Sequence, residues 1–525
     1  MTSNQRLILA FTVSFVFFMA YTAIFPPKEL ETDQNTTAKS ATLKQSSTDV
    51  ASLGANSSES EPVGSVSAAT ASADDAILTT LIGTNYILTI DTLGRISQKE
   101  MLEKKFFDEE TGNAKLVAET GAKPLYIRFA DKALNAEAIK TPYSSSIKEA
   151  NITEGSVSVV LTQKLSQLSV TKELKFYSDG HYDVKISLSE DMRYFVYLGM
   201  HPTFSDKQMM TVEGAMVDTG DHLITIIEDG DAEGLTSYNN VNLASSFSQY
   251  FASIFYGIDK DITVKIDKDR ENNPVVYMDG MKEFAFNGYI GPKDYKILHA
   301  INPDLVNAIE YGWFTFAAAP LFQLLMFLHD YVGNWGWAIV LLTIIIRLVL
   351  FPLTFKGMVS MQKLKEVSPK VKELQAKYKG DPQRMNAAVM ELYKKHGANP
   401  LGGCLPLLLQ IPVFFAIYRV LLNAVELKGA EWALWITDLA HMDPYFILPI
   451  LMGATMYYQQ RITPSNFTDP LQEKIFKFLP LIFTFFFVTF PAGLVLYWTV
   501  NNIFSIAQQF VVNKKFEAHK KAKEE

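Results

Sequence analysis

The first long hydrophobic segment of the chain lies near its start. Residues 7–25 are 19 successive residues without a charge, between Arg6 and Lys28. As a helix, this run spans the roughly 30 Å of hydrocarbon in a bilayer. The alternative is a cleaved signal peptide, whose apolar part is only about 7–15 residues long and precedes a small-residue cleavage site. Because this run is longer and ends in two prolines, we predict an uncleaved transmembrane signal anchor over residues 1–26.

Five more apolar runs follow one another in the C-terminal third. They cover residues 337–355, 405–425, 445–460, 475–490 and 494–512. We predict transmembrane helix 2 over 336–356 and transmembrane helices 3–6 over 401–512. A further run without Lys, Arg, Asp or Glu covers 311–329, but if it crossed the membrane the most basic loop of the chain would lie outside. We therefore expect the region 303–335 to hold a helix at the outer membrane–water boundary.

The Lys and Arg residues of the short loops predict the orientation of these spans, because they accumulate on the cytoplasmic side. Residues 356–395 hold ten basic and four acidic residues, and 514–523 add five basic residues, whereas 426–443 hold one basic and four acidic residues. The first two segments therefore belong in the cytoplasm and the third outside. Both termini, including the basic tail 513–525, are then cytoplasmic, and the stretch between the first two spans lies outside.

That outer stretch has two patterns of its own. Of the 49 residues 27–75, 24 are Ser, Thr or Ala and none is aromatic, so this segment is predicted to be a disordered linker. From 76 to 302, apolar and polar residues alternate in short segments separated by Asp-Gly turns. The clearest segments are 86–90, 156–161, 168–177, 182–188, 223–227, 262–266 and 275–278. Many short alternating strands over this length predict a large β-sandwich.

The cytoplasmic segment 357–400 shows helical periodicity on both sides of a break. Apolar residues recur at coiled-coil spacing in its first half and resume in its second half, as Leu364, Val367, Val371 and Leu374, then Met385, Val389 and Leu392. The sequence Gly380-Asp381-Pro382 between them stops a helix. We predict a charged helical hairpin, with a solvated connector as the alternative.

Composition narrows the classes of protein that fit. The formal net charge of −8 combines a net −16 over the first 335 residues with a net +8 from Gly336 onward. The basic residues lie between long apolar runs, which disfavours a DNA-binding protein. The single cysteine, Cys404, excludes intrachain disulfides and cysteine-rich zinc sites. No G-x-x-x-x-G-K-S/T sequence is present, so we expect no nucleotide cofactor.

The predicted β-region contains four histidines, a residue type that can bind metals or act as a catalytic base. They are His181, His201, His222 and His299, and none shows metal-ligand spacing. We therefore expect ordinary surface or strand residues and no metal site.

Arg347 is the most informative residue of the predicted spans. It lies near mid-span, roughly 12 Å from the cytoplasmic end of its helix, where an arginine costs on the order of 3 kcal/mol to insert. None of the five C-terminal spans contains Asp or Glu, so no carboxylate within them neutralises this charge. We therefore expect Arg347 to face a water-filled cavity.

Other polar residues lie in the cytoplasmic half of the spans. Thr343 lies one turn before Arg347 on the same helix face, and Gln410 lies near the cytoplasmic side of its span. One face of the last span carries Trp498, Asn502, Ser505 and Gln509, and is widened by Asn501 and Gln508. This distribution predicts a half-channel closed toward the outside, with hydrogen bonding between packed helices as the alternative for the amides of that face. Arg419, near the outer end of its span, is predicted to be structural, with its charge reaching the interface.

Four short sequences in the C-terminal half occur together in one known family. They are Asn399–Cys404 (NPLGGC), Gln410–Pro412 (QIP), Leu448–Gly453 (LPILMG) and Pro491–Tyr497 (PAGLVLY), placed after the span that contains Arg347. In this order they resemble the YidC/Oxa/Alb family of membrane protein insertases. The resemblance covers residues 305–515 well and extends loosely over the anchor and the outer domain, a layout similar to that of the Gram-negative bacterial members.

The resemblance implies a fold, a location and a site. It implies a multi-pass protein of the bacterial inner membrane, with a periplasmic galactose-mutarotase-like β-supersandwich over 76–302 and a five-helix core. It also implies a hydrophilic groove, open to cytoplasm and lipid, that contains Arg347, Thr343 and Tyr497. Trp498 stands where relatives often have a second tyrosine. Arg419 replaces another tyrosine, which leaves open whether the groove carries one positive charge or two.

The implied function is the insertion and folding of membrane proteins, alone or with the Sec translocon, by a protein that is not an enzyme and needs no cofactor. The implied partners are nascent membrane proteins, membrane lipids and the ribosome, which the basic hairpin and tail would contact. The lysines expected at that contact are Lys363, Lys365, Lys370, Lys372, Lys377, Lys379, Lys514 and Lys515.

Two other functions stay open from the residues alone. One is a secondary transporter or channel with a polar half-cavity, which the lack of an internal repeat and of an intramembrane carboxylate disfavours. The other is a membrane-anchored periplasmic carbohydrate-binding or epimerase-like protein. This second function predicts carbohydrate-binding or epimerase activity in the isolated β-region, and it leaves the position of Arg347 unexplained.

Overall fold

The computed structural model describes residues 76–108, 111–202, 204, 211–220, 223–311, 315–378, 380–397, 405–463 and 470–524. The predicted anchor 1–26 and linker 27–75 lie outside these residues. The chain divides into two compact units, Met1–Gly291 and Pro292–Glu525. The described part of the first unit is rich in β-strands and that of the second is helical, so the predicted fold class is confirmed.

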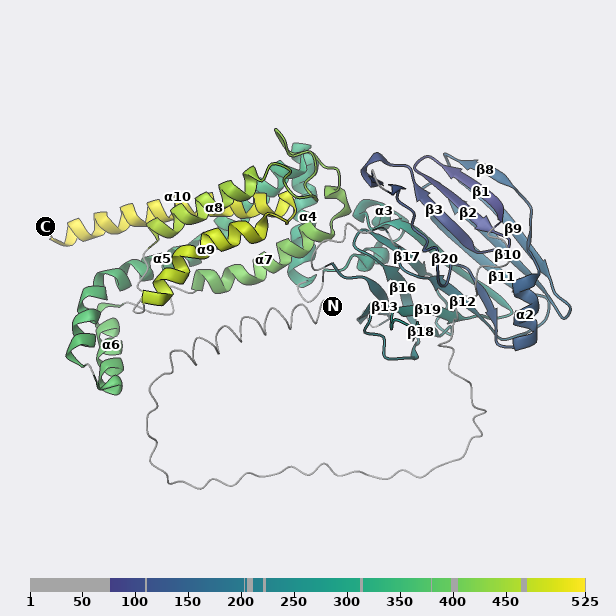
Figure 1. The fold of residues 1–525 in the computed structure, drawn as a ribbon, viewed down its shortest axis with the longest axis horizontal. Coiled ribbons are helices and arrows are strands. Elements are labelled where there is room, and N and C mark those ends of the chain that lie inside the picture. Colours follow the sequence, from purple (N-terminus) through teal and green to yellow (C-terminus); the bar gives the residue numbers. More distant parts are fainter. Residues whose placement is uncertain are drawn as a thin grey trace, which may run out of the picture. The chain divides into compact units, whose positions relative to one another are not determined.

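The β-unit is built mainly from three sheets (Figure 1). The nine-stranded sheet has the order β14 (Ile224–Glu228), β13 (Gly214–Thr219), β16 (Val241–Phe247), β17 (Phe251–Tyr256), β20 (Glu283–Pro292), β11 (His181–Leu188), β10 (Ser169–Tyr177), β9 (Ser156–Lys164) and β7 (Ser144–Ser145). The five-stranded sheet has the order β15 (Thr236–Tyr238), β18 (Val264–Lys268), β19 (Pro274–Asp279), β12 (Tyr194–Gly199) and β6 (Ile127–Phe129). The four-stranded sheet has the order β3 (Ile96–Met101), β2 (Tyr86–Asp91), β1 (Ile77–Gly83) and β8 (Glu149–Ile152).

Shorter elements complete this unit. They are η1 (Lys104–Phe106), the pair β4 (Phe107–Asp108) and β5 (Gly112–Asn113), and helix α2 (Lys132–Lys140). The pairs β1–β2, β9–β10, β10–β11 and β11–β20 are antiparallel, whereas β1 and β8 pair in parallel. Each of the seven alternating segments recognised in the sequence overlaps a strand, because a strand with one buried face needs an apolar residue at every second position.

Two lysines occupy core positions of these strands. Lys172 of β10 is fully buried, and its ammonium donates hydrogen bonds of 2.8 Å to the carbonyl oxygens of Gly94 and Leu125. Lys99 of β3 is also buried, and its ammonium lies 4.1 Å from the centre of the Tyr86 ring. Burial lowers the pKa of each lysine to about 7. Carbonyl oxygens and aromatic faces thus replace the water that these groups lose.

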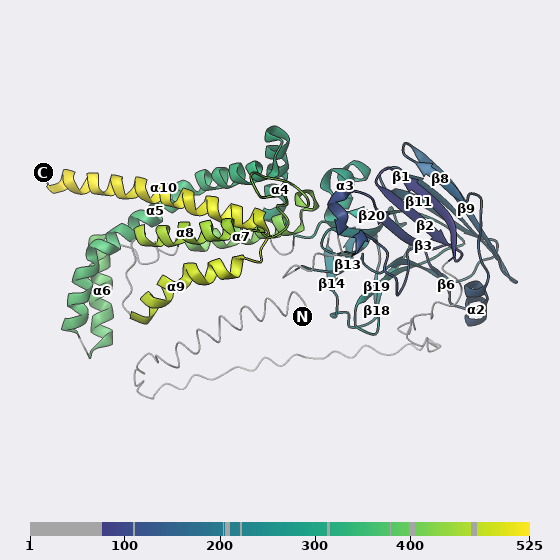
Figure 2. The same cartoon turned by 45° about the horizontal axis from the view of Figure 1, so that its top comes forward.

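The described part of the helical unit begins with α3 (Tyr295–Ile301) and η2 (Pro303–Ala308) and then contains seven longer helices and the short η5 (Val425–Leu427). The longer helices are α4 (Thr315–Val332), α5 (Trp335–Lys377), α6 (Pro382–His396), α7 (Leu405–Asn423), α8 (Ile447–Ile462), α9 (Pro470–Phe487) and α10 (Ala492–Glu524). Helix α10 packs along α5 and α8, and Figures 1 and 2 show it running beside α5. This packing brings the polar face of the last helix against the helix that carries Arg347.

Helix α5 continues without a break from the predicted span into the predicted hairpin. Its 43 residues have a length of about 65 Å at 1.5 Å per residue, roughly twice the hydrocarbon thickness. Among the described residues, α5 is the one helix that has the length and hydropathy of a membrane span. Two shorter apolar helices, Gln410–Asn423 and Phe476–Phe487, lie within α7 and α9.

Helices α5 and α6 form an antiparallel pair with an apolar seam. Val367 and Val371 are buried in this seam. The side chains packed against them are Leu364, Val389, Leu392 and Tyr393. Asp381 caps α6, because its carboxylate accepts a hydrogen bond of 3.0 Å from the Arg384 amide.

Candidate functional site

Arg347 lies inside the helical unit with only 8% of its surface exposed. Its Nε donates a hydrogen bond of 2.6 Å to the side-chain oxygen of Asn501, which lies on α10. Within the described part of the chain, no carboxylate lies within ion-pair distance of the guanidinium. The amide oxygen accepts a hydrogen bond without neutralising the charge, so Arg347 is a buried, uncompensated cation.

Tyr497 of α10 and Gln410 link α10 to a third helix, α7, beside this cation. Tyr497 is buried and lies within electrostatic reach of Arg347. Its hydroxyl oxygen accepts a hydrogen bond of 3.0 Å from the Gln410 amide of α7. Arg347, Tyr497 and Gln410, predicted from three separate apolar runs, are therefore brought together where α5, α7 and α10 meet.

The remaining polar residues of the predicted face are buried and differ in their partners. The Thr343 hydroxyl donates to the Ile339 carbonyl, and the Ser505 hydroxyl donates to the Asn501 carbonyl, both within their own helices. Asn502 faces α8, with its amide nitrogen 3.4 Å from the Met452 carbonyl oxygen. Gln509 donates to Asn513, which also accepts from Gln362 of α5. Asn513 continues the stripe by one more turn after Gln509, a spacing by which the sequence analysis could have found it.

Gln508 differs from its neighbours on α10. It is 4% exposed, and neither its side-chain oxygen nor its side-chain nitrogen has a hydrogen-bond partner among the described residues. An unpartnered buried amide costs about 1–3 kcal/mol, so bound water is the expected partner.

Trp498 lies in an aromatic cluster rather than among the polar residues. Its ring contacts Phe414 of α7 edge-on, with ring centres 4.8 Å apart, and also contacts Phe487 and Phe483 of α9. The one-residue step from Tyr497 to Trp498 turns the second ring by about 100° around the helix. Trp498 therefore packs α10 against α7 and α9.

Arg419 has a partner outside the predicted spans. Its guanidinium lies 3.6 Å from the carboxylate of Glu310, which lies two residues after the end of η2 and is 5% exposed. The Asn423 amide of α7 donates a 2.8 Å hydrogen bond to the Glu310 carbonyl. Arg419 was predicted to be structural from its place near the outer end of its span, and its counter-charge comes from the segment before α4.

Comparison with known proteins gives consistent matches over nearly the whole chain. The family profile described as "YidC periplasmic domain" matches residues 82–324, and that described as "60Kd inner membrane protein" matches residues 327–521. The membrane protein insertase YidC of Campylobacter jejuni is 49% identical over 99% of this chain and 98% of its own length. The membrane protein insertase YidC of Wolinella succinogenes is 46% identical over 99% of this chain and 96% of its own length. The chain belongs to the YidC family of membrane protein insertases.

One solved structure of the family can be set beside these matches. A crystal structure of an active YidC insertase with its first transmembrane domain resolved is 18% identical and aligns with 83% of this chain and 94% of that chain, with a TM-score of 0.36. Family membership rests on the sequence matches. It agrees with the resemblance read from the short motifs, although Asn399–Cys404 lies outside the described residues.

The lysines expected at a ribosome contact lie on both basic segments of this YidC-family chain. Lys365, Lys370, Lys372 and Lys377 on α5, and Lys514 and Lys515 on α10, are exposed. Lys363 is half-buried near the Gly397 carbonyl, to which its ammonium donates at 3.4 Å. Lys379 lies outside the described residues.

Proposed function

We propose that this chain inserts proteins into the inner membrane through a hydrated groove lined by the polar residues around Arg347, alone or beside the Sec translocon. The observation that carries the proposal is Arg347 itself, a buried cation with an amide partner and, among the residues that the structure describes, no carboxylate partner. Such a charge is too costly to keep in a dry helix bundle unless water or a substrate contacts it.

Water in the groove gives the polar residues a common role. It hydrates Arg347 and the unpartnered Gln508 amide, and it shortens the apolar distance that a polar peptide segment must cross. Arg347 then attracts acidic or polar residues of the arriving chain into the groove. No nucleotide hydrolysis and no cofactor enter this mechanism.

The apolar segment of the substrate leaves the groove toward lipid along α7 and α9. Helix α9 presents exposed apolar side chains that suit a lipid-facing surface, and these are Phe478, Leu481, Ile482, Phe485 and Phe486. Each CH₂ group that passes from water into lipid contributes about 0.8 kcal/mol. Hydrophobic transfer thus drives insertion once the polar segment has entered.

The proposed topology puts the α5–α6 hairpin and the end of α10 in the cytoplasm and the β-unit in the periplasm. The exposed lysines of the hairpin and tail then face the ribosome, whose RNA is a polyanion. Nascent membrane proteins reach the groove from this side.

Charge reversal tests the ribosome contact. The test variant reverses the charge of four hairpin lysines: Lys365→Glu, Lys370→Glu, Lys372→Glu and Lys377→Glu. We expect the amount of this variant that co-sediments with translating ribosomes to fall at least about tenfold below wild type, because each reversal removes a phosphate contact. The wild-type interaction should also weaken as salt rises. A control variant with Lys132→Glu and Lys140→Glu, both exposed on α2 of the β-unit, should bind as wild type does. Equal binding by the hairpin variant would exclude this contact.

Complementation tests the function itself. Cells depleted of their own insertase would express this chain, and protease protection would report the insertion of a small Sec-independent membrane protein. We expect the wild type to restore insertion. A failure to restore it, despite normal amounts of protein in the membrane and matched Sec partners and ribosomes, would contradict the proposal.

A further inference from the structure

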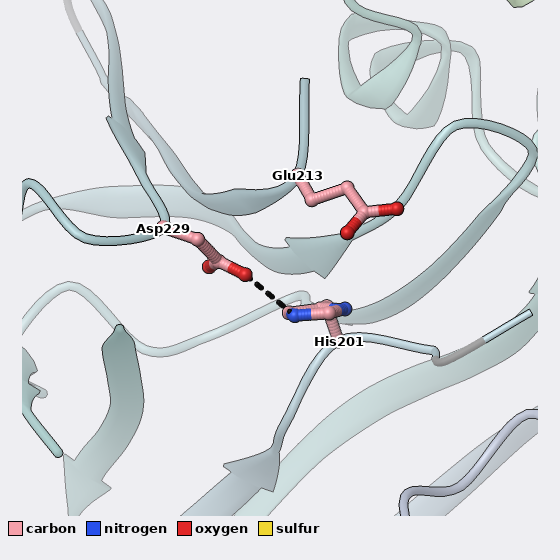
Figure 3. Close-up of side chains that lie close together, drawn as sticks. All are labelled: His201, Glu213 and Asp229. Carbon is pink, nitrogen blue, oxygen red and sulfur yellow. Dashed lines mark ion pairs between the residues drawn. The ribbon is translucent and has the colours of Figure 1, made fainter. Parts of the chain in front are cut away.

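Three potential metal ligands meet in the β-unit at a place that no sequence motif marks. His201 follows β12, Glu213 precedes β13 and Asp229 follows β14. One ligand atom from each lies within 4.8 Å of the others. Figure 3 shows the two carboxylates directed toward the imidazole from separate segments. The group is half-buried, so solvent and ions reach it.

The strand register explains why the carboxylates adjoin. Strands β13 and β14 pair antiparallel with Gly214 opposite Glu228, which puts Glu213 opposite Asp229 one step beyond the ladder. A 3.0 Å hydrogen bond from the Asp229 amide to the Glu213 carbonyl oxygen fixes this pair. Like charges directly opposite each other destabilise a sheet. A positive charge between these two carboxylates therefore stabilises the fold.

The imidazole is oriented as in metal sites. His201 Nδ1 lies 3.1 Å from the Pro202 carbonyl oxygen, which only accepts, so Nδ1 carries a proton and Nε2 is directed into the group. Metal-ligating histidines commonly donate their other ring N–H to a backbone carbonyl in this way. Nε2 lies 2.8 Å from Asp229 Oδ2. Asp229 Oδ1 is buried without a hydrogen-bond partner among the described residues.

From this arrangement we infer that His201, Glu213 and Asp229 form a binding site for a divalent transition-metal ion of the zinc class. One imidazole and two carboxylates are a ligand set suited to Zn²⁺, with water in the remaining position. The metal replaces the proton shared by His201 and Asp229, which leaves to solvent. Mg²⁺ and Ca²⁺ prefer all-oxygen ligand sets, so the imidazole selects against them.

A metal here would join two sheets. Strand β12 belongs to the five-stranded sheet, whereas β13 and β14 form the end of the nine-stranded sheet. Binding to the folded state alone stabilises it by mass action. The inference is independent of the proposed insertion mechanism, because none of the three residues belongs to the helical unit.

Direct metal analysis tests the site. Full-length protein without a histidine tag would be purified in detergent, stripped with a chelator and dialysed against ZnCl₂, and its zinc content would be measured by mass spectrometry. We expect one zinc ion per wild-type chain and a higher unfolding temperature with zinc. We expect each of three substitutions to weaken zinc binding, namely His201→Ala, Glu213→Gln and Asp229→Asn. The loss of affinity should be at least as large as the roughly 10–100-fold caused by mutating residues that only support metal ligands.

The control is His181→Ala. His181 also pairs with one carboxylate, that of Asp179, but it belongs to no three-residue group among the described residues, so zinc binding should be unchanged. Glu213→Gln and Asp229→Asn preserve side-chain shape, and circular dichroism would verify their folding. Zinc binding by these folded variants equal to that of wild type would overturn the inference. So would displacement of the zinc by excess MgCl₂.

Discussion

Replacing Arg347 with alanine is expected to abolish most insertion of a substrate with an acidic translocated segment. Charge-assisted contacts contribute about 1.5–3 kcal/mol, which corresponds to about 10- to 100-fold in insertion at 1.4 kcal/mol per factor of ten. Arg347→Glu should fail completely, because it repels the acidic segment. Arg347→Lys should act in part, since it keeps the charge but loses the planar group that reaches Asn501. Protease protection of the substrate in complemented cells measures all three.

Two controls make this series specific. Arg461→Ala removes an exposed arginine of α8 that lies over the Tyr457 ring, and it should insert the substrate as wild type does. A second substrate whose translocated segment carries no charge should depend less on Arg347. Normal insertion by Arg347→Ala, Arg347→Lys and Arg347→Glu would show that the groove works without its charge, and the electrostatic step of the mechanism would then be wrong.

Glu310→Ala is expected to destabilise the helical unit by about 3 kcal/mol, the lower end of the range for buried ion pairs, because it leaves the Arg419 guanidinium, whose side chain is 18% exposed, without its counter-charge. Denaturant titration of the purified chain in detergent measures the free energy of unfolding. The double variant Glu310→Leu/Arg419→Leu should recover most of the loss, since it removes both charges and keeps apolar volume.

The pair Lys296–Asp330 provides the matched comparison. It is also an ion pair of the helical unit, at 2.7 Å, but both side chains are more than half exposed. Asp330→Ala should therefore change the free energy of unfolding by less than about 1 kcal/mol. A loss in Glu310→Ala no larger than in Asp330→Ala would show that the Glu310–Arg419 pair contributes only as surface pairs do.

The helices and strands were largely predictable, because their signals are local. A helix that faces lipid or protein on all sides needs a long apolar run, and a half-buried strand needs alternation, so the C-terminal runs and segments such as 182–188 already identify their elements. The polar face of the last helix was predictable for the same reason, since Asn502, Ser505 and Gln509 follow the helical period. Lys172 was not, because the two carbonyls that hold it come from loops far along the chain.

By itself, the sequence determined the order of the elements, the family and the unusual position of Arg347, because composition, motif order and periodicity lie along the chain. Only the tertiary structure decided which side chains contact one another. Arg347 meets Asn501 across 154 positions, and Arg419 meets Glu310 from outside the spans. His201 meets two acids only because strand pairing places them opposite each other. Such contacts depend on which faces of the helices and strands pack together. That packing is determined by the whole fold and not by the local sequence.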